Sequence, residues 1–254
     1  MSRIIVTGAA GQIGQAITME LVGNGHTVVA MDIAPQPALT EAAEATPEQL
    51  GFVPVDVTNA ASVTAAFGQA AETLGKVDGF VNAVGIISRA PFMETTAEQL
   101  ERLLQVNLIG ALRTSQAAAA CMQASGGSII HIASVHALMG IAGRAAYAAS
   151  KGGLVAMVRV MATELAEFNI TANVIAPGPV GVGMGGIAAS RQQMIAATPL
   201  GRVAEPSEIS GMVSFLLSEP ARFITGQVFP LDGGLSSKTL ASPDPDIVPN
   251  TGVR

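Results

Sequence analysis

The stretch that decides the fold is TGAAGQIG, residues 7–14, which follows a short apolar run and opens a helical pattern. Its glycines, Gly8, Gly11 and Gly14, allow a tight turn and let the backbone approach a pyrophosphate group closely. A helix that begins inside such a turn also presents free N–H groups to an anion. A glycine-rich turn alone is a weak signal, because a plain strand-to-helix turn often contains glycine, so the surrounding sequence has to decide.

An acid stands where a dinucleotide site needs one. Asp32 ends the second apolar run, VVAMDI, eighteen residues after Gly14. A carboxylate at this place can hydrogen-bond to the ribose diol of NAD, and it repels the 2′-phosphate of NADP. No Lys or Arg lies in the turn or just after Asp32. These features favour a cofactor contact over an ordinary turn or capping role, and they predict NAD as the cofactor.

Beyond this unit, short β-branched runs alternate with longer helical patterns. The runs are continuously apolar, which is typical of a parallel sheet covered on both faces. The alternation predicts an α/β three-layer Rossmann fold with a doubly wound parallel sheet of about seven strands. Strands are expected at residues 4–7, 27–33, 51–55, 79–84, 127–133, 171–176 and 227–231, and helices near 12–24, 59–75, 96–124, 145–168 and 206–218.

The composition excludes several classes of protein. The 254 residues, 49% of them hydrophobic and 13% charged, suffice for one large globular domain. A net charge of -6 without any Lys/Arg block argues against a nucleic-acid partner. The single Cys121 fits a reducing compartment, and a strand that begins almost at the start leaves no room for a signal peptide. With no apolar run of membrane length, the expectation is a cytoplasmic protein with no membrane partner.

A tyrosine and a lysine stand one helical turn apart in YAASK, residues 147–151. Side chains at this spacing are neighbours on a helix. A free tyrosine has a pKa of about 10 and is a poor base at neutral pH. A nearby ammonium and a positive nicotinamide ring would both favour the phenolate, and lowering its pKa by ~3 units corresponds to ~4 kcal/mol. The spacing alone also fits an ordinary amphipathic helix in which Tyr147 only packs.

With these motifs in order, the chain resembles the short-chain dehydrogenases/reductases from residue 3 to about 234. The resemblance rests on TGAAGQIG (7–14), DVT (56–58), NAVG (82–85), VNLIG (106–110), IIHIASV (129–135), YAASK (147–151), NVIAPGPV (173–180) and LDGG (231–234). It implies a catalytic tetrad of Asn107, Ser134, Tyr147 and Lys151, with Tyr147 as general acid/base. It also implies cofactor contacts at Gly8, Gly11, Gln12, Ile13, Gly14, Asp32, Ile33, Asp56, Val57, Asn82, Ala83, Gly85, Tyr147, Lys151, Pro177, Gly178 and Val180. No metal is expected, because the histidines show no metal-ligand spacing.

The chain departs from the family pattern at a few places. Gln12 replaces the usual middle glycine of the turn, which gives the spacing Gly-x-x-Gly-x-x-Gly found in the extended branch of the superfamily. Ala83 replaces an asparagine and removes one side-chain hydrogen bond. The few residues after Pro177 and Gly178, in PGPVGVGMGG (177–186), include no Thr, so backbone groups around Val180 are expected to contact the carboxamide.

The expected function is NAD(H)-dependent interconversion of a secondary alcohol and a ketone. Residues 178–200 should form a loop and short helix over the substrate as a mobile lid. The lid has no acid and one cation, Arg191, which suits a small neutral carbonyl or alcohol. Two alternatives remain: a 3-oxoacyl-carrier ketoreductase, which would normally want NADPH and a basic docking patch, and an NAD-binding regulator without turnover.

The domain organisation follows from the same patterns. Residues 1–235 form a single NAD-binding catalytic domain, and residues 236–254 an extended C-terminal tail. Apolar residues in 96–124 and 145–168 spread beyond one stripe, and relatives pair these helices, so a homotetramer is expected. His131 is expected to be structural, His136 either to line the substrate pocket or to lie in a plain loop, and Arg89 and Arg144 to be solvated surface at the mouth.

Overall fold

Seven parallel strands form one sheet at the centre of the molecule, in the order β3-β2-β1-β4-β5-β6-β7. The computed structural model describes residues 1–183 and 188–237, with the backbone alone for residues 188–191. The strands are β1 (Arg3–Thr7), β2 (Thr27–Asp32), β3 (Leu50–Pro54), β4 (Gly79–Asn82), β5 (Gly127–Ile132), β6 (Ile170–Pro177) and β7 (Val228–Leu231). The strand order reverses between β1 and β4, as in a doubly wound sheet. The predicted fold class is therefore confirmed.

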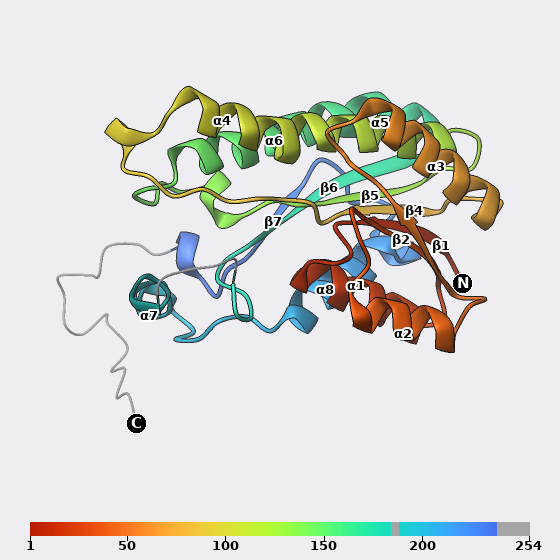
Figure 1. Ribbon diagram of the computed structural model, residues 1–254, viewed down its shortest axis with the longest axis horizontal. Helices are drawn as coiled ribbons and strands as arrows, with labels where there is room; N and C mark the ends of the chain where they lie inside the picture. The colour runs from red at the N-terminus through yellow and green to blue at the C-terminus, as the bar shows by residue number, and fades with distance from the viewer. Residues whose placement is uncertain (184–187, 238–254) are drawn as a thin grey trace.

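Helices cover both faces of the sheet. Figure 1 shows α3 to α6 on one side and α1, α2 and α8 on the other. The helices are α1 (Gln12–Gly23), α2 (Pro37–Ala45), α3 (Ala60–Leu74), α4 (Ala97–Leu104), α5 (Gly110–Met122), α6 (Ala145–Glu164), α7 (Ala188–Ala197) and α8 (Pro206–Leu217). Each face has its own apolar core, and every residue of β4, β5 and β6 is buried. Burial on both faces explains why the strands are continuously apolar in sequence.

Two helical regions differ from the sequence expectation. The sequence does not predict α2, in which Leu39 is the one buried residue, so the segment lacks an apolar stripe. The expected helix at 96–124 is interrupted by a π-helical turn, η2 (Gln105–Ile109), between α4 and α5. Asn107 is the buried residue of this turn.

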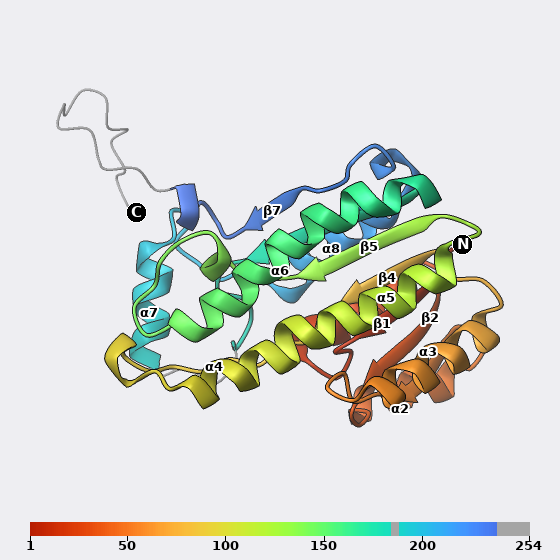
Figure 2. The ribbon, with the colours of Figure 1, turned by 90° about the horizontal axis from the view of Figure 1, so that it is seen from above.

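The strands end together at one end of the molecule. Figure 2 shows the arrows of β4, β5 and β7 pointing toward the end where α7 lies. In parallel sheets, ligands bind outside these carboxyl ends, where the strand order reverses. The helix α7 lies within the expected lid, whereas residues 184–187, the Arg191 side chain and the tail from residue 238 lie outside the described residues.

The predicted homotetramer stays a prediction. Leu112 of α5 and Val160 of α6 expose apolar side chains.

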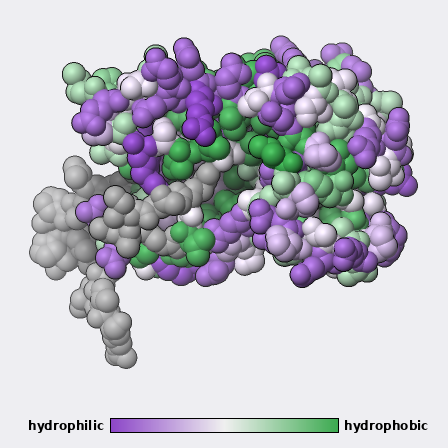
Figure 3. All heavy atoms as spheres, in the orientation of Figure 1, coloured by the Kyte–Doolittle hydropathy of each residue, from purple (hydrophilic) through white to green (hydrophobic). Residues whose placement is uncertain are grey.

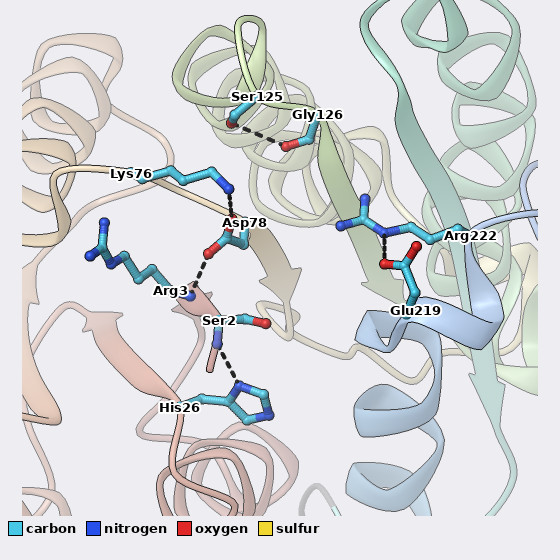
Figure 4. A network of polar contacts seen from close by, with 9 residues as sticks. All are labelled: Ser2, Arg3, His26, Lys76, Asp78, Ser125, Gly126, Glu219 and Arg222. Carbon is cyan, nitrogen blue, oxygen red and sulfur yellow. Dashed lines mark hydrogen bonds and ion pairs between the residues drawn. The ribbon is translucent and has the colours of Figure 1, made fainter.

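The opposite end of the sheet is tied by polar contacts (Figure 4). Asp78, just before β4, accepts a hydrogen bond from the Arg3 backbone N–H at 3.0 Å and pairs with the Lys76 ammonium at 2.6 Å. The Asp78 N–H in turn donates to the Arg3 carbonyl. Ser2 donates its backbone N–H to Nδ1 of His26 before β2. The contacts of Asp78 fix the start of β1 against that of β4.

We expect Asp78→Ala to lower the free energy of unfolding by about 1.5–3 kcal/mol, because a backbone N–H loses a charged acceptor. Lys76→Met removes only a half-exposed ion pair and should lower it by about 0–1 kcal/mol. Urea unfolding of both variants beside the wild type measures the difference. Equal losses would show that the ion pair, and not the backbone hydrogen bond, carries the effect.

Candidate active site

A cavity of about 250 Å³ opens at the carboxyl ends of the strands. On the face drawn in Figure 3, hydrophobic residues gather between the hydrophilic rims of the two helical layers. Of the predicted site residues, those that line the cavity are Gly11, Gln12, Ile13, Gly14, Ala83, Gly85, Ser134, Tyr147, Lys151, Pro177, Gly178 and Val180. The fold thus brings the glycine turn and three members of the expected tetrad to one cavity.

The glycine turn forms a close-packed cradle at the start of α1. Gly8 has a φ of +75°, and a Cβ on it would lie 2.5 Å from the Ala83 backbone. A Cβ on Gly14 would collide with the Gly8 carbonyl, whereas one on Gly11 would meet only that oxygen at 3.4 Å. No side chain caps α1 at Gly11, so the N–H groups of its first turn remain available to an anion. The cradle fits the pyrophosphate of a dinucleotide.

The two predicted acids lie on the same side of this turn, at the carboxyl ends of β2 and β3. Asp32 lies at the end of β2, where Oδ2 accepts the Ala10 N–H at 3.0 Å and Oδ1 accepts the Ile33 N–H at 2.7 Å. Asp56 follows β3, and its Oδ1 accepts from the Thr58 N–H and hydroxyl. These hydrogen bonds lower the pKa of Asp56, and burial opposes them.

The predicted residues that do not line the cavity are Gly8, Asp32, Ile33, Asp56, Val57, Asn82 and Asn107.

Gln12 connects the turn to the segment that follows β6. A Cβ on Gly181, whose φ is +46°, would collide with the Gln12 amide, so the two residues lie in direct contact. The residue that replaces the family's middle glycine therefore reaches across the cavity toward the start of the expected lid. The sequence alone did not indicate this contact.

Asn82 anchors a buried chain of polar groups behind the cavity. Its Oδ1 accepts the Val84 N–H and the Thr7 hydroxyl, both at 3.1 Å, which leaves its Nδ2 to donate to Nδ1 of His131 at 3.1 Å. Burial lowers the pKa of His131 to about 3, so its ring is neutral and its proton lies on Nε2, 3.0 Å from the Ser115 hydroxyl. The Ser115 hydroxyl donates a hydrogen bond to the Ala111 carbonyl. His131 is structural, as predicted.

Asn107 lies in the π-helical turn η2 and is 1% exposed. Its Oδ1 accepts the Ile86 N–H at 2.8 Å, and its Nδ2 donates to the Ile86 carbonyl and the Ser150 hydroxyl. The amide thereby holds the segment after β4 against α6, beside the cavity wall. A Cβ on Gly85 would lie 3.7 Å from this Oδ1, so Gly85 passes close to the amide.

Lys151 is a buried cation, 3% exposed, in the second turn of α6. Its Nζ donates to the Ile132 carbonyl at 2.9 Å and lies 3.5 Å from the Val84 carbonyl. Burial lowers the pKa of Lys151 to about 8, so the ammonium form still predominates at pH 7. A Cβ on Gly85 would lie 3.0 Å from Nζ, which explains why this position suits glycine.

Tyr147 and Ser134 lie beside each other on the wall of the cavity. Burial raises the pKa of Tyr147, while a hydrogen bond with Ser134 and the charge of Arg144 oppose the rise. Without cofactor, the pKa of the Tyr147 phenol is therefore raised, whereas the sequence led us to expect a lowered one. The cation that opposes the rise is Arg144, and not Lys151 as expected from the sequence. Ser134 Oγ lies 2.9 Å from Nδ1 of His136, whose ring packs edge-on against Tyr147 at 5.4 Å. His136 therefore lines the pocket.

Arg144 was expected at the surface, and that expectation is wrong. It precedes α6, lines the cavity and is 9% exposed. Its Nη1 donates to the Ser88 carbonyl at 3.3 Å. Arg89 lines the same cavity, as an exposed residue. Sequence gives no signal for the burial of Arg144, because the residues that cover it are distant in the chain.

The described part of the chain contains no group of three His, Cys, Asp or Glu residues that could hold a metal. Within it, no helix combines the length and the apolar character needed to cross a bilayer. The polar side chains that line the cavity include the Ser134 hydroxyl, the Tyr147 phenol, the Lys151 ammonium, the Arg144 guanidinium and the His136 imidazole.

Comparisons with known proteins agree with this geometry. A family model described as enoyl-(acyl carrier protein) reductase matches residues 8–236. The 3-oxoacyl-[acyl-carrier-protein] reductase MabA of Mycobacterium tuberculosis is 39% identical over 91% of this chain and 92% of its own. Trans-4-hydroxycyclohexanecarboxylate dehydrogenase of Sinomonas cyclohexanicum is 35% identical over 91% of both. A short-chain dehydrogenase/reductase from Serratia marcescens superposes with a TM-score of 0.86 at 31% identity, over 92% of this chain and 98% of its own. The chain is an oxidoreductase of the short-chain dehydrogenase/reductase family.

Proposed function

We propose that this oxidoreductase interconverts a secondary alcohol and a ketone with NAD(H), and that Tyr147 is the general acid/base. The observation that carries the proposal is the placement of Tyr147, Ser134 and Lys151 on one cavity whose far end is the glycine turn. Relatives act on related groups: one is named for a 3-oxoacyl substrate and another for a hydroxycyclohexanecarboxylate. Both names describe a ketone or a secondary alcohol.

The protein groups divide the work as follows. Bound NAD(H) would accept or supply the hydride, held by the α1 N–H groups, Asp32 and Lys151. Ser134 holds the substrate oxygen by a hydrogen bond. The Tyr147 phenolate takes the hydroxyl proton during oxidation, and the Tyr147 phenol gives a proton to the carbonyl oxygen during reduction. The charge of Arg144 and the hydrogen bond with Ser134 make loss of the phenol proton less costly. Asn107 keeps the segment after β4, and hence Gly85, against Lys151.

The choice of NAD rests on charge around the adenosine ribose. Asp32 is a carboxylate at the end of β2, and the first Lys or Arg after Arg3 is Lys76. The glycine turn, β2 and the segment after it thus offer no cation for a 2′-phosphate, which a site for NADP would need.

The two alternatives make different predictions. A 3-oxoacyl-carrier ketoreductase, supported by the likeness to MabA, would turn over 3-oxoacyl thioesters faster than free ketones. A regulator without turnover has no need for the buried Tyr147 and Lys151, both of which cost free energy to bury. The presence of both groups favours an enzyme.

We expect the wild type to prefer NAD over NADP, and Asp32→Asn to reduce that preference at least about tenfold in kcat/KM. The variant keeps one amide oxygen, which can accept either the Ala10 or the Ile33 N–H, and it removes the negative charge that repels a 2′-phosphate. Initial rates with both cofactors, followed at the absorbance of the reduced nicotinamide, measure the ratio. A wild type that prefers NADP contradicts the assignment.

We expect Tyr147→Phe to lower kcat by on the order of 10²–10⁴-fold, the usual contribution of a general acid/base. Binding of NADH should change little, because the ring and its contact with His136 remain. The chain has no tryptophan, so NADH fluorescence or calorimetry follows binding without interference. Near-normal turnover would mean that another group transfers the proton.

Tyr147 is the only tyrosine of the chain, so tyrosinate absorbance reports its ionisation alone. We expect a midpoint above the ordinary value of about 10 in the folded protein, because burial disfavours the phenolate. Saturating NAD should move the midpoint down, since its nicotinamide ring is positive. Tyr147→Phe supplies the blank, and a midpoint below 10 without cofactor would show that the cations outweigh burial.

A further inference from the structure

The charged side chains that line the cavity beside Tyr147 are all positive among the described residues. Among the described residues, its wall contains three cations, Arg89, Arg144 and Lys151, and no Asp or Glu. Lys151 donates to main-chain carbonyls at the end toward the cofactor turn. Arg144 belongs to the other side, directly before α6, where a substrate would lie against Tyr147.

The Arg144 guanidinium is incompletely satisfied although it is buried. Its one hydrogen bond within the described chain runs from Nη1 to the Ser88 carbonyl, and its Nε is buried without an acceptor there. The ion pairs in that part of the chain, Lys76–Asp78, Arg202–Glu208 and Arg222–Glu219, do not include it. Burial of a cation without a compensating anion is unfavourable.

The neighbours of Arg144 make this part of the cavity more positive still. The charge of Arg89 acts on Arg144, and both arginines act on His136. His136 has its Nδ1 on Ser134, whereas its Nε2 is buried without a partner among the described residues. Two side chains with unused polar atoms therefore stand beside Tyr147, in a cavity whose other lining includes Ile87, Val182 and Met194.

We propose that the substrate of this site carries a carboxylate, held by the Arg144 guanidinium and by His136, on an apolar skeleton that bears the reacting alcohol or ketone. The inference rests on the proposed function for the reacting group. A guanidinium offers several N–H donors in a planar fork that matches a carboxylate. The composition of the lid led us to expect a neutral substrate. We replace that expectation with a carboxylate, because the positive charge that would bind it belongs to Arg144, directly before α6, and not to the lid.

The test compares cyclohexanecarboxylate with cyclohexanecarboxamide, which have nearly the same shape and differ in charge. Calorimetry measures their binding to wild type saturated with NAD, and rates with trans-4-hydroxycyclohexanecarboxylate and its carboxamide measure kcat and KM. We expect the carboxylate to bind at least about tenfold more tightly. The same preference should appear in KM more than in kcat. Arg144→Met, which keeps the length and removes the charge, should abolish the preference.

Arg159→Met is the matched control, because Arg159 lies exposed on the same helix and does not line the cavity. It should keep the wild-type preference. Arg144→Lys keeps a charge but not the fork and should fall between wild type and Arg144→Met, which provides a second variant if Arg144→Met unfolds. Equal or absent binding of both ligands by the wild type, or a preference that survives in Arg144→Met, overturns the proposal.

The binding measurement separates this inference from the proposed function. Tight, Arg144-dependent binding of the carboxylate without turnover of any alcohol or ketone would support the anion site and reject the proposed chemistry. Turnover of neutral ketones without a preference for carboxylates would do the reverse.

Discussion

A buried ammonium is the constraint on which the rest of this structure depends. Lys151 is almost fully enclosed, and a cation in such a place is tolerated only when its protons find acceptors. The acceptors are carbonyls at the end of β5 and just after β4. Helix α6, the register of β4 against β5, and the glycine at position 85 must therefore agree within a fraction of an ångström.

The buried polar chain behind the cavity meets that demand. Thr7, Asn82, His131 and Ser115 join β1, β4, β5 and α5 through neutral groups, each with a defined donor and acceptor. Asn82 and His131 are also register partners across β4 and β5. A slip of one residue would break every member of the chain at once, since alternate side chains face opposite sides of a sheet. The network specifies the alignment that Lys151 needs.

Sequence predicts what repeats along the chain and misses what tertiary contacts decide. The strands and the glycine turn follow from apolar runs and backbone geometry, and their positions agree with the structure to within a few residues. Helix α2 buries little and leaves no periodic pattern. The burial of Arg144 and the contact of Gln12 with Gly181 arise from segments that meet only after folding. The tetrad could be located by resemblance, whereas the positive half of the cavity could not.

The π-helical turn at Gln105–Ile109 has a consequence for how such a site can change. A π turn corresponds to one residue inserted into an α-helix, with the helix on either side keeping its orientation. Deleting a single residue there would close the helix into regular α form while α4 and α5 still faced the same neighbours, and the side chains of the turn itself, the Asn107 amide among them, would leave their places. That asparagine can thus be gained or lost by one small insertion or deletion. The position of Lys151 has no such freedom, since it depends on the alignment of the whole sheet.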